Sequence, residues 1–201
     1  GCYDKAGNAV GVFGRSSFLI FIVVLGIESA RQTVARLKKG RRAEELEQFA
    51  LNDSMTGMYN RNAYDYFVKN EKDFEGYVIV TFDLNNLKQC NDQYGHRAGD
   101  EYIINAAHII EDNFERYGKC YRIGGDEFCC IIPKGRYFKI ERVMHKIDQD
   151  VEILNHKNII PVPVGIAYGY AVFTADDTDP EKVRERADKD MYRNKKTMKQ
   201  S

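Results

Sequence analysis

The chain has 201 residues with 30 basic and 30 acidic side chains, so it carries no net charge that would favour a nucleic-acid partner. Its 43% hydrophobic and 12% aromatic residues support a packed core and argue against a disordered chain. Five cysteines without a C-x-x-C pair indicate reduced, buried thiols. The length suffices for one domain with an appendage.

The appendage begins with residues 1–27, which are wholly apolar from Phe18 to Ile27 and carry Arg15 just upstream. A membrane-spanning helix needs about 20 apolar residues. The segment fits either the end of a transmembrane helix or a buried strand of a sensor region. A secretory signal fits least, because no small-residue cleavage site follows. Six basic residues between 31 and 42 are typical of the cytoplasmic side of a membrane, and equally of a solvated helix face. We expect membrane attachment through this segment.

Residues 28–52 have a helical pattern in which Val34, Leu37, Leu46 and Phe49 recur at near-heptad spacing. The stretch is too short to establish a sustained coiled coil. Two interpretations remain: a signalling helix that pairs with its copy in a dimer, and a plain connector.

A folded domain is predicted for residues 53–201. Asn60 is a good N-cap for a helix over 61–72. Residues 76–83 then form an apolar, buried strand that ends in Asp83. Burying a carboxylate is costly unless it has a partner or a metal, which makes Asp83 a candidate site residue.

Two helices follow the strand, one starting at residue 84 and one over 100–117, with a turn between them. The later part of the domain has the pattern of a helix over 136–154, a strand over 162–173 and a helix that Pro180 opens.

Residues 120–132 have the pattern of a β-hairpin whose turn contains Gly124 and Gly125. Asp126 and Glu127 stand at the same turn. A turn without side chains lets phosphates approach the backbone, and adjacent acids can hold a hard divalent cation. An ordinary solvated hairpin shares this pattern, so the hairpin alone does not identify a site.

The element order β-α-α-β-β-α-β-α becomes a ferredoxin-like plan when one helix is removed. We therefore expect an α+β, palm-type fold with a central antiparallel sheet flanked by helices. The first strand should run antiparallel beside the third, which would bring Asp83 to Asp126 and Glu127. Three acids beside a glycine turn suit two-metal phosphoryl or nucleotidyl transfer.

Four stretches resemble, in order and spacing, the signatures of the GGDEF domain of diguanylate cyclases: NDSMTGMYNR, FDLNNLKQCNDQYGHRAGD, YRIGGDEF and ADKDMYRNKK. The resemblance covers about Asp53 to Lys196. It implies condensation of two GTP into cyclic di-GMP with release of two pyrophosphates, at the interface of a homodimer. It also implies Mg²⁺ as cofactor, with Mn²⁺ as a substitute.

The resemblance assigns a role to each matching position. Asp83, the carbonyl of Leu84, Asp126 and Glu127 would bind the metal ions, and Glu127 or Asp126 would assist deprotonation. Asn91 and Asp100 would read guanine, and Lys195 would bind phosphate. Gly124 and Gly125 would let the phosphates approach, and Arg122 would support either the phosphates or the hairpin. Asp53 and Arg61 resemble a pair that ties the incoming helix to the domain and relays signals.

The chain departs from the family pattern at three places. Asn85 and Asn86 stand where an Asp and a variable residue are common. The last-helix Gly-Arg-Asn is replaced by residues 198–200, in which Lys199 could supply charge to phosphate without the fork of an arginine. The inhibitory Arg-x-x-Asp motif is missing from residues 115–118, so we expect no inhibitory site.

No core acid is lost, so we expect an active enzyme: the cytoplasmic catalytic domain of a bacterial inner-membrane sensor protein. One alternative is a non-catalytic module that binds GTP or cyclic di-GMP. Another is a different nucleotidyl or adenylyl cyclase, against which Asp100 argues because adenine lacks the donor pair that a carboxylate would accept.

Overall fold

The computed structural model describes residues 25–34, 36, 38, 50–136 and 140–198, which fall into two units, Gly1–Gln48 and Phe49–Ser201. In the first unit, residues 25–34 are helical and exposed. Within the described residues, no helix is both long enough and apolar enough to cross a membrane. Most of the apolar segment and much of the predicted connecting helix lie outside the described residues, so both predictions stay predictions.

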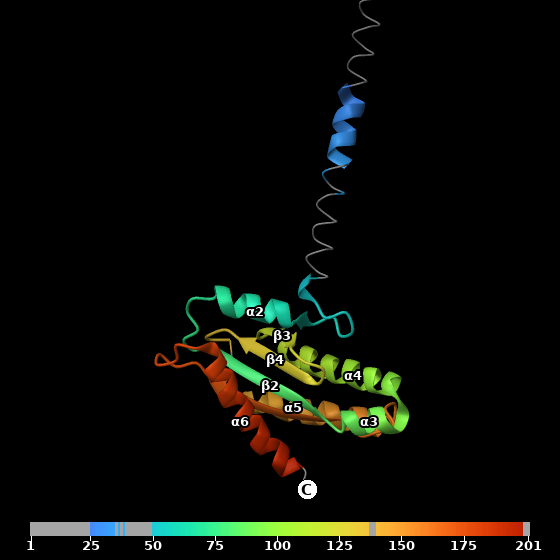
Figure 1. Cartoon of the computed structure of the whole chain (residues 1–201), viewed down its shortest axis with the longest axis vertical. Helices are drawn as coiled ribbons and strands as arrows, with labels where there is room; N and C mark the ends of the chain where they lie inside the picture. Colours follow the sequence, from blue (N-terminus) through green and yellow to red (C-terminus); the bar gives the residue numbers. More distant parts are fainter. Residues whose placement is uncertain (1–24, 35, 37, 39–49, 137–139, 199–201) are drawn as a thin grey trace, which may run out of the picture. The chain divides into compact units, whose positions relative to one another are not determined.

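The second unit is an α+β domain (Figure 1). In chain order its elements are β1 (Tyr59–Asn60), α2 (Arg61–Asn70), β2 (Val78–Asn85), α3 (Leu87–Tyr94), α4 (His96–Phe114), β3 (Lys119–Arg122), β4 (Glu127–Ile132), α5 (Ile140–His156), β5 (Gly165–Val172) and α6 (Pro180–Met198). The helices and strands predicted for residues 53–201 are present, with α4 beginning at His96 instead of residue 100, and β1 is an addition.

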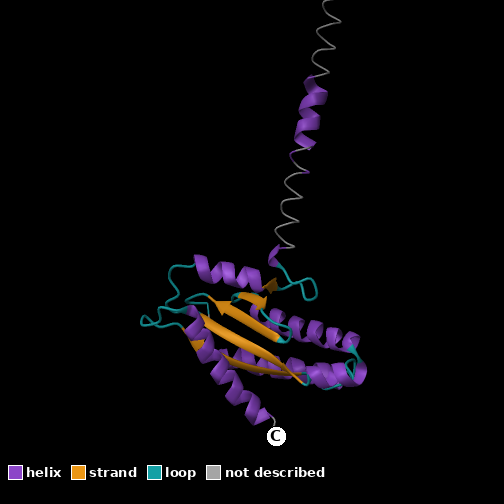
Figure 2. Ribbon diagram, viewed as in Figure 1, coloured by secondary structure: helices purple, strands orange, loops and turns teal. Residues whose placement is uncertain are grey.

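The strands form one five-stranded sheet in the order β1-β3-β4-β2-β5. Helices flank this sheet (Figure 2). The pairs β2–β4, β2–β5 and β3–β4 are antiparallel. The pair β2–β4 confirms the predicted pairing of the first strand with the third, and β3–β4 confirms the predicted hairpin. The two-residue strand β1 pairs in parallel with β3, so the sheet as a whole is mixed.

Side chains alternate along each strand, so apolar residues point to both faces of the sheet, and helices cover both faces. Val80 and Phe82 of β2 belong to one core cluster, together with Ala106 and Ile110 of α4. Ile79, on the opposite face, belongs to a second cluster with residues of α2 and α6. Asp83 follows Ile79 at an even spacing and therefore lies on the face that α2 and α6 cover.

Helix α6 packs directly onto β5 at Gly169. A Cβ atom at this position would lie 2.1 Å from the Met191 nitrogen and 2.4 Å from the Ala187 carbonyl oxygen. Both are backbone atoms of the helix, so a side chain at residue 169 would force the two elements apart. The glycine thus fixes how closely the last helix approaches the sheet.

Candidate active site

Asp83 and Glu127 lie directly opposite each other on β2 and β4. Side chains of directly opposed residues in an antiparallel pair project from the same face of the sheet. The next residue of β2 also bonds to the turn, because the Leu84 N–H donates to the Asp126 carbonyl oxygen at 3.1 Å. The register thus brings the end of β2 beside the glycine turn, as the strand order predicted.

The turn itself is closed by two hydrogen bonds, from the Ile123 and Gly124 nitrogens to the Glu127 carbonyl oxygen, at 3.0 and 3.2 Å. Neither glycine of the turn has a positive φ, so left-handed backbone is not the reason for either of them. A Cβ at Gly124 would lie 2.9 Å from Oε2 of Glu127, whereas one at Gly125 would meet nothing within 4 Å. The side chain of Glu127 therefore lies against Gly124, and Gly125 leaves its backbone open to a ligand.

The register brings the three predicted acids to one end of the sheet, but their carboxylates do not converge, so metal binding by them stays a prediction. Among the described residues, no three His, Cys, Asp or Glu side chains are grouped closely enough to hold a metal ion. Glu127 lies against the turn, and Asp83 is bound instead by the ammonium group of Lys195, which pairs with its Oδ1. The register fixes where the backbone positions lie but leaves the directions of these flexible side chains free.

The donor atoms nevertheless suit a hard divalent cation. Asp83 and Glu127 offer carboxylate oxygens from one face of the sheet, and Mg²⁺ prefers oxygen ligands. The ammonium group of Lys195 already occupies a cation position at Asp83. The side chains of Lys195 and Asp83 are only 24% and 19% exposed, so the pair is partly withdrawn from water.

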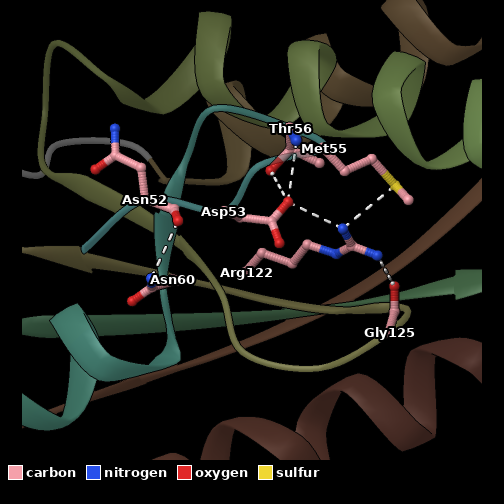
Figure 3. Close-up of polar contacts among 7 residues, drawn as sticks. All are labelled: Asn52, Asp53, Met55, Thr56, Asn60, Arg122 and Gly125. Atoms are coloured by element: carbon pink, nitrogen blue, oxygen red, sulfur yellow. Dashed lines mark hydrogen bonds and ion pairs between the residues drawn. The ribbon is translucent and has the colours of Figure 1, made fainter. Parts of the chain in front are cut away.

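Arg122 holds the hairpin turn (Figure 3). Its Nη1 donates to Oδ1 of Asp53 at 2.9 Å and to the Met55 sulfur at 3.3 Å, and its Nη2 donates to the Gly125 carbonyl oxygen at 2.9 Å. Of the two roles left open for Arg122, the structure shows support of the hairpin.

Asp53 is the centre of the contacts on the other side of Arg122. Its Oδ1 also accepts from the Thr56 backbone nitrogen at 3.0 Å and the Thr56 hydroxyl at 2.8 Å. Burial alone would raise the pKa of Asp53, but the hydrogen bonds from Arg122 and Thr56 outweigh it and hold the pKa below its usual value. The carboxylate is therefore charged throughout the neutral range.

Asp53 pairs with Arg122 and not with Arg61, so the relay role of these two residues stays a prediction. Arg61 is the first residue of α2, and its ion pair is with Asp65 one turn further along the helix, at 3.9 Å and largely exposed. The tie to the incoming chain is made instead by Asn60 (Figure 3), whose Nδ2 donates to the carbonyl oxygens of Ala50 and Asn52. Asn60 also caps α2 as predicted, because its Oδ1 accepts from the Ala63 nitrogen at 3.0 Å.

The two predicted guanine readers meet at the corner between α3 and α4. A Cβ at Gly99 would lie 1.9 Å from Oδ1 of Asn91, so the Asn91 side chain lies against the start of α4. Asp100, the next residue, is exposed. The Asn91 amide thus lies against the residue that immediately precedes Asp100 in the sequence. Lys199, the other predicted phosphate contact, lies outside the described residues.

Tyr102 connects this corner to the sheet and was not predicted. Its hydroxyl donates to the Asn85 carbonyl oxygen at the end of β2 and accepts from the Gly165 nitrogen at 2.7 Å. Burial raises the pKa of Tyr102 to about 12, so the phenol stays neutral and keeps its proton for this bond. In the sequence, Tyr102 occupies an apolar position of a helix. That position gives no signal that its hydroxyl bonds to the sheet.

Comparison with known proteins places this arrangement in a family. The model of the diguanylate cyclase GGDEF domain matches residues 50–201. MucR of Pseudomonas aeruginosa, a bifunctional diguanylate cyclase/cyclic di-GMP phosphodiesterase, is 30% identical over 172 residues, which are 81% of this chain and 24% of MucR. The diguanylate cyclase DgcS of Shewanella oneidensis is 29% identical over 158 residues, or 76% of this chain and 52% of DgcS. The chain thus spans from about a quarter to about half the length of these relatives.

Among solved structures, the chain is similar to the coiled coil and GGDEF domain of DgcB from Caulobacter crescentus, determined in complex with c-di-GMP. The two share 23% identity with a TM-score of 0.71, over 86% of this chain and 95% of that one, a likeness of fold. The family match covers well over half of the present chain, and its signature turn lies beside the carboxylate of β2. The chain belongs to the diguanylate cyclase GGDEF-domain family.

Proposed function

We propose that this domain is an active diguanylate cyclase, which condenses two GTP molecules into cyclic di-GMP and two pyrophosphates. The observation that carries the proposal is the pairing of Asp83 with Glu127 beside an open glycine turn, with Lys195 bound to Asp83. This arrangement combines acidic groups for a metal, a backbone that phosphates can approach and a cation for their charge.

The cofactor in this proposal is Mg²⁺, with Mn²⁺ as a substitute. Asp83, Glu127, Asp126 and the carbonyl of Leu84 would hold it, because all four supply hard oxygen donors at the end of β2 or at the turn. When bound, a divalent cation neutralises phosphate charge and polarises the phosphorus that is attacked.

The chain's own residues bind and orient the substrate. Asp100 accepts hydrogen bonds from the guanine edge, Asn91 contacts the same edge through its amide, and Lys195 neutralises phosphate charge. Glu127 or Asp126 accepts the proton of the attacking 3′-hydroxyl. Arg122 touches no substrate in this scheme and keeps the turn in place through Gly125.

Each domain binds one GTP, so the reaction needs two copies of the chain. The 3′-hydroxyl on one subunit attacks the α-phosphate on the other, and the exchange repeated in the opposite direction closes the ring. The homodimer is therefore part of the proposal, since one hairpin supplies half of a reaction centre.

The test is incubation of the 201-residue chain with GTP and Mg²⁺, followed by chromatography for cyclic di-GMP. We expect product from the wild type, and a loss of about 100-fold or more in Asp83→Asn, in line with the loss of a group that stabilises transition-state charge. Asp112→Asn is the matched control, because Asp112 is an exposed residue of α4 outside the site. Tight GTP binding by calorimetry in a dimeric sample that forms no product would instead favour the binding module.

Base selection has its own test. Asp100→Ser should weaken the preference for GTP over ATP, because the carboxylate that accepts from the guanine N1 and N2 hydrogens is lost. An unchanged preference in competition assays would contradict the role of Asp100 and leave the cyclase proposal in place.

A further inference from the structure

Lys195 stands out at the site because its ammonium group binds the very carboxylate that a metal ion would need. It contacts Oδ1 of Asp83, and 112 positions of sequence separate the two residues. The ion pair is partly buried, so neither group is fully solvated by water.

The backbone of α6 holds Lys195 in this place. Asn194, the preceding residue, donates from Nδ2 to the Tyr168 carbonyl oxygen on β5 at 3.0 Å. Gly169, next on the strand, allows the helix backbone to lie against the sheet. Tyr168 is paired with Phe82, the residue before Asp83. The lysine is therefore anchored one strand away from the carboxylate that it binds.

An ammonium group and a divalent cation cannot share these oxygens without strong repulsion, because two like charges at ion-pair distance oppose each other in a partly desolvated site. Binding of a metal at Asp83 thus favours movement of Lys195 to another anion. The triphosphate of a bound nucleotide is such an anion, and the flexible four-carbon stem of the lysine allows the ammonium group to reach it.

We propose that Lys195 couples metal binding to nucleotide binding: it competes with the divalent cation for Asp83, and an incoming triphosphate relieves the competition by binding the ammonium group. This inference rests on the proposed metal site. By linkage, whatever factor the nucleotide adds to metal affinity, the metal adds equally to nucleotide affinity. The site would then bind a metal weakly on its own and tightly together with its substrate.

The experiment measures Mn²⁺ binding to the 201-residue chain without any nucleotide, from the electron paramagnetic resonance signal of free Mn²⁺. We expect Lys195→Met to bind Mn²⁺ about two- to fivefold more tightly than the wild type, which is the scale set by removal of one partly exposed ion pair. Lys196→Met is the matched control. It removes the same charge from the adjacent residue, whose ammonium group lies over the Tyr192 ring at 4.5 Å, and it should leave Mn²⁺ affinity unchanged.

A second variant, Asp83→Asn, shows whether the Mn²⁺ that is measured binds at Asp83. Asp83→Asn should weaken Mn²⁺ binding in both the wild-type and Lys195→Met backgrounds, with urea unfolding as the check that each variant is folded. Equal Mn²⁺ affinity in Lys195→Met and the wild type, or no measurable binding by either, would overturn the competition. Tighter binding in Lys195→Met that survives Asp83→Asn would overturn it too, since the metal would then lie elsewhere. Failure of the cyclase proposal is read separately, from product formation by the wild type.

Discussion

Arg122 and Asp53 form an ion pair at 2.9 Å across 69 positions of sequence, and the same guanidinium group holds the carbonyl of Gly125. One side chain therefore joins the start of the folded unit to the turn that carries the acids. Its exposed fraction of 10% indicates that water cannot easily replace these bonds.

Replacing Arg122 should destabilise the domain through that junction. Arg122→Met leaves the Asp53 carboxylate and the Gly125 carbonyl without this donor, and we expect a loss of about 1–3 kcal/mol in the free energy of unfolding in urea. Arg61→Met is the control: its ion pair is exposed and long, so the loss should stay below about 0.5 kcal/mol. Similar losses in both variants would show that the Arg122 contacts stabilise the domain no more than an ordinary surface ion pair does.

The same contacts predict a pH dependence. The pKa of Asp53 is lowered in the folded state, so its stabilising effect is complete above the ordinary value of 3.8 and is lost as the pH falls through the lower folded value. The stability difference between the wild type and Asp53→Asn should therefore be constant from pH 7 to 5 and shrink below about pH 3.8. Urea unfolding at a series of pH values measures it, and a difference that grows on acidification would contradict the assigned shift.

Gly169→Ala should separate α6 from the sheet. The added methyl group would meet backbone atoms of the helix, which cannot rotate away, so we expect a loss of about 1–3 kcal/mol or more. Gly125→Ala is the comparison for stability, because its methyl group meets nothing within 4 Å and its φ is not positive, and the change should stay within about 0.5 kcal/mol. If the two variants unfold at the same urea concentration, the close approach at residue 169 is not a constraint.

Tyr102→Phe should lower stability by about 1–3 kcal/mol, because the Asn85 carbonyl and the Gly165 N–H lose their shared partner in a buried place. Tyr94→Phe, on α3, removes a hydroxyl from a ring that is 54% exposed and should have little effect. Thermal unfolding of the two variants, followed by circular dichroism, compares them. No difference between them would mean that water satisfies both groups.

The sequence predicted the order of the elements well because periodic apolar residues and glycine turns are local signals. From that order, the antiparallel pairing of β2 with β4 followed, and with it the meeting of Asp83 and Glu127. The strand β1 escaped prediction because two residues are too few to show a period, and their pairing depends on β3, some 60 positions later.

The directions of long side chains could not be predicted in the same way. A strand pattern tells which face Glu127 belongs to, but the structure shows its carboxylate against Gly124, and Lys195 on Asp83. The resemblance linked Asp53 with Arg61, whereas the fold pairs Asp53 with Arg122. Such pairings depend on tertiary contacts that no local pattern contains.

Because side chains alternate along β2, the correct position of Asp83 depends on the register of this strand. Phe82 belongs to the core on one face of the sheet, and Asp83 lies on the other face, beneath Lys195. A slip of one residue between β2 and β4 would exchange the two, placing a carboxylate in an apolar core and a phenyl ring in the site. The burial of Phe82 therefore favours the same register that places Asp83 in the site. A chain in the wrong register would be unstable, so it would not present a misplaced carboxylate to a nucleotide.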